Sequence, residues 1–126
     1  PLLQQSGIQL IAGSDAAALN TYVYPAESLL QELEIFQQSG LTPLQILQAA
    51  TLAGARYFNV EEKVSSIEVG KRADLMLLDE NPLKDIRALR KINAVMVRGL
   101  WYDRKQLNLF LEAAHQKKLE LDQRRK

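Results

Sequence analysis

The chain is 126 residues long, and its 47% content of hydrophobic residues is ordinary for a globular domain with a buried core. Its 16 basic and 15 acidic residues leave a formal charge of +1, which gives no reason to expect nucleic acid or a membrane surface as a partner. The absence of cysteine excludes disulfides, thiolate catalysis and sulfur-ligated metal sites from this sequence. No membrane span or signal peptide is recognisable, so the compartment stays undecided, with a soluble cytoplasmic protein favoured over a secreted one.

The first apolar run, Ile8–Ala12, is short and partly β-branched, and it ends at Gly13-Ser14-Asp15. A run of this length that breaks at a glycine is typical of a buried parallel strand ending in a loop. Asp15 is therefore expected at the C-terminal end of a strand. Because Pro1 is not a natural initiator residue and the run begins almost at once, we expect the sequence to be part of a longer protein.

A helical pattern follows from Pro25 onward. Leu29, Leu33 and Phe36 recur at the spacing that places them on one helical face, and Gly40 supplies a C-terminal stop. This helix is expected to cover a sheet with its apolar face.

A second helix is predicted over about residues 43–53. Thr42 can cap its N-terminus, Pro43 suits the first helical position, and Gln45 can reach back to complete a capping box. Between residues 57 and 66 the periodicity fades, which indicates a short helical turn and a loop.

Strand-like runs dominate the next part of the chain. Residues 66–70 alternate in polarity, and residues 73–79 are an apolar run of strand length, with a polar turn between the two. Residues 94–97 and 100–102 flank Arg98-Gly99, which indicates a hairpin or a strand that bends at the glycine. Together these runs predict a small sheet.

The last predicted element is a helix that starts at Asp103. Asp103 can cap it, and Gln106 stands at the position that completes a capping box. The apolar face of this helix is formed by Leu107, Phe110, Leu111, Ala114 and Leu121.

Six short motifs occur in a fixed order along the chain, and each is a weak signal by itself. They are Ala12-Gly-Ser-Asp-Ala16, Gly40-Leu-Thr-Pro43, Gln48-Ala-Ala-Thr51, Val69-Gly-Lys-Arg-Ala-Asp-Leu75, Asp79-Glu-Asn-Pro-Leu83 and Val95-Met-Val-Arg-Gly99. In this order they resemble the C-terminal third of the metal-dependent amidohydrolase superfamily, in the branch of imidazolonepropionase-like and prolidase-like enzymes.

This resemblance implies an α/β fold that is incomplete in the present chain. Residues 1–56 resemble the last β-strand and following helices of a (β/α)8 TIM barrel. Residues 57–102 resemble the C-terminal contribution to a small composite β-sandwich, and residues 103–126 resemble a closing C-terminal helix. Catalytic residues of such barrels lie at the C-terminal ends of the strands, where the pattern also places Asp15.

The resemblance also implies the chemistry. It makes the chain part of a hydrolase of carbon–nitrogen bonds in small molecules such as amides, dipeptides or cyclic ureides. Asp15 would contact a divalent metal, expected to be zinc, or its bound water, and would carry a proton from that water to the leaving nitrogen. Tyr22 and Tyr24, in the loop after Asp15, are candidate substrate contacts.

Each candidate also has a structural explanation. Asp15 follows Gly-Ser, where an aspartate often serves as a turn residue or a helix cap. Asp74 is expected to be structural, and His115, the only histidine, is expected to be a surface or packing residue. Trp101 and Tyr102 are adjacent in a predicted strand, so they point to opposite faces and are expected to serve packing.

The remaining metal ligands of the family, which are histidines and a carboxylate or carboxylated lysine on earlier strands, are absent from this sequence. The 126 residues are therefore expected to bind no metal tightly and to be inactive by themselves. Unpaired strand edges and uncovered helix faces would favour association with a second copy or with the rest of a longer chain. The alternative is a non-catalytic binding or structural module, or one part of a split protein.

Overall fold

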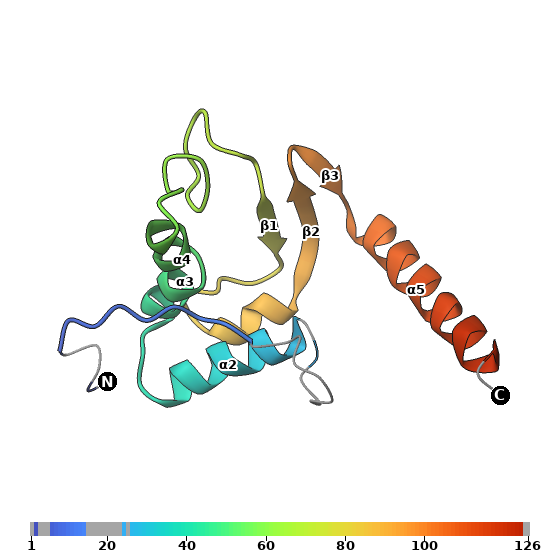
Figure 1. Ribbon diagram of the computed structural model, residues 1–126, viewed down its shortest axis with the longest axis horizontal. Coiled ribbons are helices and arrows are strands. Elements are labelled where there is room, and N and C mark those ends of the chain that lie inside the picture. The colour runs from blue at the N-terminus through green and yellow to red at the C-terminus, as the bar shows by residue number, and fades with distance from the viewer. Residues whose placement is uncertain (1, 3–5, 15–23, 25, 125–126) are drawn as a thin grey trace.

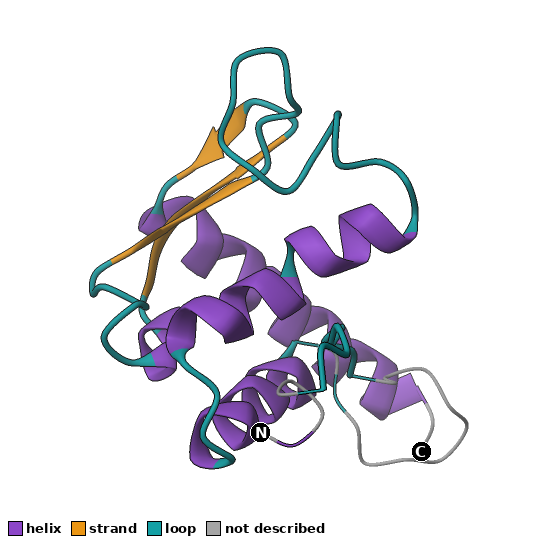
Figure 2. Cartoon of the chain, turned by 90° about the vertical axis from the view of Figure 1, so that its left-hand side faces the viewer, coloured by secondary structure: helices purple, strands orange, loops and turns teal. Residues whose placement is uncertain are grey.

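The computed structural model describes residues 2, 6–14, 24 and 26–124, and it combines a helical part with a small antiparallel sheet (Figures 1 and 2). The described elements follow in the order α2 (Glu27–Gln38), α3 (Pro43–Ala50), α4 (Leu52–Tyr57), β1 (Leu75–Leu78), η1 (Ile86–Arg90), β2 (Ile92–Val97), β3 (Leu100–Tyr102) and α5 (Arg104–Arg124). The helices α2 to α4 lie together on one side of the sheet, and α5 extends away on the other (Figure 1).

Helix α2 confirms the first predicted helix, although it starts at Glu27 and ends at Gln38. Its central apolar residue, Leu33, is only 3% exposed. After Ser39 the chain turns through Gly40, whose φ of 91° lies in the left-handed region that glycine occupies without a Cβ clash.

Helix α3 begins with the predicted capping box. The Thr42 backbone N–H donates to the Gln45 side chain at 2.8 Å, and the Gln45 N–H donates to the Thr42 hydroxyl at 3.4 Å. The predicted helix over residues 43–53 is interrupted, however, because Thr51 adopts φ −132° and ψ −83°. The Thr51 hydroxyl donates to the Leu47 carbonyl at 2.6 Å, and α4 starts at the next residue.

The core joins parts of the chain that are far apart in sequence. Five buried side chains form one cluster, namely Leu33 on α2, Leu41 before α3, Ile46 on α3, and Ile86 and Leu89 on η1. Polar contacts reinforce the contact of α2 with η1. The Ile86 N–H donates to the Gln37 side chain at 2.9 Å, and Arg90 pairs with Glu34 at 2.6 Å and with Glu27 at 2.9 Å.

The sheet has the order β1-β2-β3, and both strand pairs are antiparallel. Arg98 and Gly99 form the two-residue turn between β2 and β3, with φ values of 50° and 81°. Positive φ at both central residues is the geometry of a type I′ turn, which matches the twist of paired strands. The predicted hairpin is therefore confirmed. Within the same sheet, Ala94 at the centre of β2 is fully buried.

Two predicted strands do not form in this structure. Residues 8–14 run without strand pairing, and residues 66–70 end in a turn in which the Lys71 N–H donates to the Glu68 carbonyl at 3.2 Å. The alternating apolar side chains of the second segment face solvent, with Ile67 86% exposed. A strand requires a neighbour for its backbone groups, and no other described strand lies beside either segment.

The predicted C-terminal helix is present as α5, and its capping box is complete. The Asp103 N–H donates to the Gln106 side chain at 2.9 Å, and the Gln106 N–H donates to the Asp103 carboxylate at 2.8 Å. None of the residues of α5 is buried. No helix in the described part of the chain combines the length and the apolar character that a membrane-spanning segment requires.

The core predicts a clear difference between two isoleucines. Ile86 is 2% exposed and joins η1 to α2, so Ile86→Ala should lower the free energy of unfolding by about 2–5 kcal/mol through lost burial and a residual cavity. Ile67 is 86% exposed, so the matched change Ile67→Ala should alter the free energy of unfolding by less than about 0.5 kcal/mol. Chemical denaturation measures this free energy for both variants, and equal effects of the two changes would contradict this assignment of the core.

Candidate functional site

The segment that leads to Gly13-Ser14-Asp15 lies on the helical part of the molecule. Leu10 and Ala12 pack against the buried cluster, whereas Ile8 and Ile11 are 51% and 46% exposed. The Ala12 N–H donates to the carbonyl of Ala49 on α3 at 3.1 Å. The segment is thus held to the core through Leu10 and Ala12, and two of its isoleucines stay exposed.

A carboxylate also binds the end of this segment. The Gly13 N–H donates to Oε2 of Glu32 on α2 at 2.9 Å, and the two residues are 19 positions apart. A hydrogen bond to an ionised acceptor is stronger than a neutral one, so this contact ties Gly13 to α2. The sequence pattern did not indicate Glu32, because nothing local connects a helix-surface glutamate with a glycine 19 residues earlier.

Asp15 and Tyr22 lie outside the described residues, so their predicted roles stay predictions. Tyr24 is described, and its side chain is 65% exposed. Its backbone carbonyl accepts hydrogen bonds from the Ser28 N–H at 3.0 Å and the Ser28 hydroxyl at 2.8 Å. Tyr24 therefore stands at the start of α2 with an open aromatic ring.

A metal site is not assembled by the described residues. No group of three or more histidine, aspartate or glutamate side chains among them could hold an ion. His115 lies on the exposed helix α5, remote in sequence from Glu32, whose carboxylate binds Gly13. The donor set of this part of the chain therefore does not fit a catalytic zinc, which takes three protein ligands.

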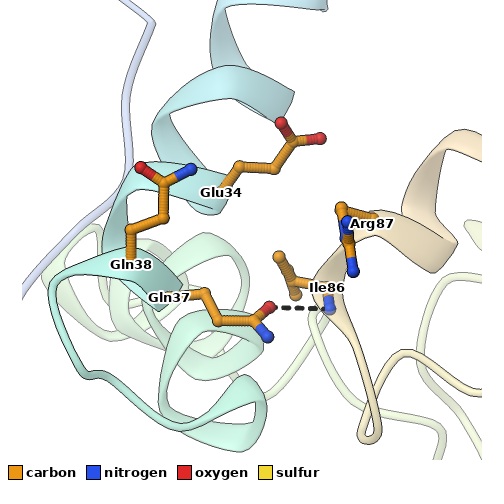
Figure 3. Close-up of a pocket in the computed structure, with 5 residues that line it drawn as sticks. All are labelled: Glu34, Gln37, Gln38, Ile86 and Arg87. Carbon is orange, nitrogen blue, oxygen red and sulfur yellow. Dashed lines mark hydrogen bonds between the residues drawn. The ribbon is translucent and has the colours of Figure 1, made fainter.

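A separate hollow lies between α2 and η1. It measures about 330 Å³ and is lined by Glu34, Gln37, Gln38, Ile86 and Arg87 (Figure 3). Its charged groups are engaged, because Glu34 pairs with Arg90 and Arg87 pairs with Asp85 at 2.6 Å. Among the described residues, neither Gly13 nor Ser14 lines this hollow.

A smaller hollow of about 100 Å³ borders the predicted strand segment. Its walls come from residues 8–10 and from the chain around α3 and α4, namely Leu41, Gln45, Gln48, Ala49 and Ala53. It therefore lies beneath the segment that carries the turn.

Asp74 has the structural role that the sequence predicts. Its Oδ1 accepts the backbone N–H of Arg98 at 2.7 Å, and its other oxygen pairs with Arg72. The hydrogen bond from Arg98, followed by the contact with Arg72, lowers the pKa of this carboxyl. Asp74 thus fastens the β2–β3 turn to the chain before β1.

Glu27, Glu34 and Arg90 form the ionic contact between α2 and η1, and sequence reasoning missed it. The hydrogen bond from Arg90 lowers the pKa of Glu27, and the two glutamates together raise the pKa of Arg90. The two acids are one heptad apart on α2, whereas Arg90 lies 56 and 63 residues from them. No local pattern identifies a contact over such a separation.

Packing was expected for both aromatic residues of β3, and the structure confirms it for Tyr102. Tyr102 packs its ring on Phe110 of α5 at a centroid distance of 5.6 Å, whereas Trp101 is 49% exposed. Tyr102 thus serves packing between sheet and helix.

The chain is similar in sequence to a known protein family and to individual enzymes. The sequence profile described as the amidohydrolase family matches residues 1–102. A 5′-deoxyadenosine deaminase from Methanobrevibacter smithii is 38% identical over 74 residues, which are 55% of this chain and 17% of that protein. An imidazolonepropionase from a Geobacillus strain is 37% identical over 76 residues, which are 56% of this chain and 18% of that protein.

A solved structure extends the similarity to most of the chain. A candidate prolidase from Bifidobacterium longum superposes with a TM-score of 0.70 and 30% identity, over 90% of this chain and 29% of that protein. The chain thus spans less than a third of the length of each of these three relatives.

The geometry of Asp74 predicts its titration. Its pKa should lie below the ordinary aspartate value of about 3.9, because the Arg98 N–H and Arg72 favour the ionised form. Because the pKa of Asp74 is lower in the folded chain than in the unfolded chain, Asp74 stabilises the fold fully at pH values above its ordinary pKa. This stabilisation is lost as the pH falls through the pKa of the folded chain. NMR of the Asp74 carboxyl carbon through an acid titration measures this, and a midpoint at or above the ordinary value would contradict the contact.

Proposed function

Because the chain belongs to the amidohydrolase family, we propose that it is the C-terminal part of a hydrolase that acts on carbon–nitrogen bonds in small molecules. The observation that carries this proposal is the family match over residues 1–102, which includes the Gly13-Ser14-Asp15 turn. The relatives named as a deaminase, an imidazolonepropionase and a candidate prolidase support the same reaction class.

The similarity and the packing support an arrangement in three parts. The amidohydrolase-like α/β fold is common to the chain and its relatives. Within it we propose that residues 1–56 complete a TIM barrel, residues 57–102 contribute to a β-sandwich and residues 103–126 form the C-terminal helix. The segment 8–12 supports the barrel assignment, because Leu10 and Ala12 already pack on the core, and Ile8 and Ile11 are exposed apolar side chains that a neighbouring strand would cover.

Asp15 is the proposed acid–base residue. A carboxylate just beyond a strand can accept a proton from the attacking water and return it to the leaving nitrogen, which makes the amine a better leaving group. The hydrogen bond of Gly13 to Glu32 and that of Ala12 to Ala49 support this role, since they hold the chain up to two residues before Asp15.

The proposed cofactor is a divalent metal, with zinc preferred, which would lower the pKa of a bound water to about 7. The described residues of this chain do not fit such an ion on their own. Apart from Asp15, its ligands would have to come from outside this sequence. Tyr22 and Tyr24 are the proposed substrate contacts, and the exposed ring of Tyr24 supports its part in this.

A non-catalytic binding or structural module, or one part of a split protein, is the second candidate. The open reading frame that contains this sequence separates the two candidates. The hydrolase requires a His-x-His pair and further histidines elsewhere in the reading frame. A frame without them would exclude the hydrolase and favour the non-catalytic module.

Replacement of Asp15 tests the catalytic role in the longer hydrolase. Asp15→Asn keeps the size of the side chain but removes the proton acceptor, so kcat should fall by about 10²–10⁴-fold. Asp74→Asn serves as the control, because Asp74 is bound to the β2–β3 turn, and it should leave kcat nearly unchanged. Turnover is measured as release of the amine or ammonia, and near-normal turnover in Asp15→Asn would exclude the proposed role.

Metal binding by the 126-residue chain is a separate prediction. Because a catalytic zinc needs three protein ligands, calorimetry should detect no tight stoichiometric zinc binding to this chain. The longer hydrolase is the positive control. Tight binding to the 126-residue chain would show that its own side chains build a site.

A further inference from the structure

Two successive backbone N–H groups of the segment that leads to Asp15 donate to two different helices. Ala12 donates to the carbonyl of Ala49 on α3 at 3.1 Å, and Gly13 donates to Oε2 of Glu32 on α2 at 2.9 Å. The first bond joins backbone to backbone, whereas the second depends on one side chain. Replacement of Glu32 can therefore release Gly13 while Ala12 stays bound.

Gly13 needs an outside contact of this kind, because its own backbone restrains the chain least. Glycine has the widest range of backbone conformations of any residue, and a Cβ added at Gly13 would meet nothing within 4 Å. Steric crowding at this position therefore does not set the direction in which the chain leaves Gly13 toward Asp15. The hydrogen bond to Glu32 supplies a restraint that the glycine itself lacks.

Glu32 stands on a helix that the core holds in place. The next residue, Leu33, is only 3% exposed and belongs to the buried cluster. One turn further along α2, the Gln37 side chain accepts the N–H of Ile86 at 2.9 Å. A carboxylate on a helix that is fixed in this way has a defined position, as a residue that supports an active site requires.

We propose that Glu32 is a positioning residue of the hydrolase, which holds Gly13 so that Asp15, two residues later, is aligned for proton transfer. This inference rests on the proposed function of Asp15. Glu32 acts through the backbone of Gly13 and does not itself exchange a proton. The effect on the rate is large, because a misplacement of about 1 Å can slow a reaction by about 10²-fold.

Removal of the Glu32 carboxylate tests this role in the longer hydrolase. Glu32→Ala should lower kcat by about 10–100-fold through lost alignment of Asp15, and it should change KM by less than about twofold. The divalent metal is supplied in excess, so that a weaker affinity for the metal does not lower kcat. Glu32→Gln retains an oxygen acceptor of the same reach, so its kcat should stay within about threefold of the unchanged enzyme.

Glu34→Ala is the matched control on the same helix. The Glu34 carboxylate pairs with Arg90 at 2.6 Å, and Arg90 keeps Glu27 as a second partner when Glu34 is removed. Glu34→Ala should therefore leave kcat nearly unchanged, and circular dichroism verifies that both alanine variants are folded. Equal losses of kcat in Glu32→Ala and Glu34→Ala would overturn the proposal, because the loss would then come from general damage to α2.

A double variant separates positioning of Asp15 from any independent effect of Glu32. If Glu32 acts through Asp15, the combination of Asp15→Asn with Glu32→Ala should turn over as slowly as Asp15→Asn alone, because no proton carrier is left to align. Losses that multiply in the double variant would show that Glu32 acts apart from Asp15 and would exclude the positioning role.

The positioning role and the role of Asp15 fail in different ways. Near-normal turnover in Asp15→Asn would exclude the acid–base role of Asp15 and the role of Glu32 with it. A strong loss in Asp15→Asn together with near-normal turnover in Glu32→Ala would overturn the role of Glu32 alone.

Discussion

Burial of the apolar face of helix α2 is the constraint on which the rest of this structure depends. Leu33 lies in one cluster with Leu41 and Ile46, which follow it in the chain, and with Ile86 and Leu89, which lie about 50 residues later. The polar side of the same helix binds Gly13 through Glu32, and it binds η1 through Gln37 and through the pairing of Glu34 with Arg90. One helix therefore supports both the segment that leads to Asp15 and the segment between β1 and β2.

The local elements were predictable because their signals are local. The capping boxes at Thr42 and Asp103 and the Arg98-Gly99 turn are formed by residues within three positions of one another, and all three occur as the sequence indicates. The segments 8–12 and 66–70 have strand-like patterns but lack strand neighbours, so the pattern alone did not fix their structure. The contacts of Glu32 with Gly13 and of Arg90 with Glu27 span 19 and 63 residues, and no sequence spacing indicates them.

The proposed chemistry is consistent with a chain that supplies only part of an active site. The described residues hold the approach to Asp15 but assemble no metal cluster, so they provide a support for a catalytic carboxylate and not a complete site. Exposed apolar side chains lie on the segment before Asp15, on the loop around Ile67 and on α5, and each belongs to a surface that gains stability when it is covered. We propose that a longer hydrolase covers the first two of these surfaces.

The central claim is that α2 holds the segment that leads to Asp15, and the Gly13 amide proton reports on it directly. In the NMR spectrum this proton should lie further upfield in the Glu32→Gln variant than in the unchanged chain, because a neutral amide oxygen is a weaker acceptor than a carboxylate. A Gly13 proton with the same chemical shift in both chains would show that α2 does not hold this segment and would contradict the account.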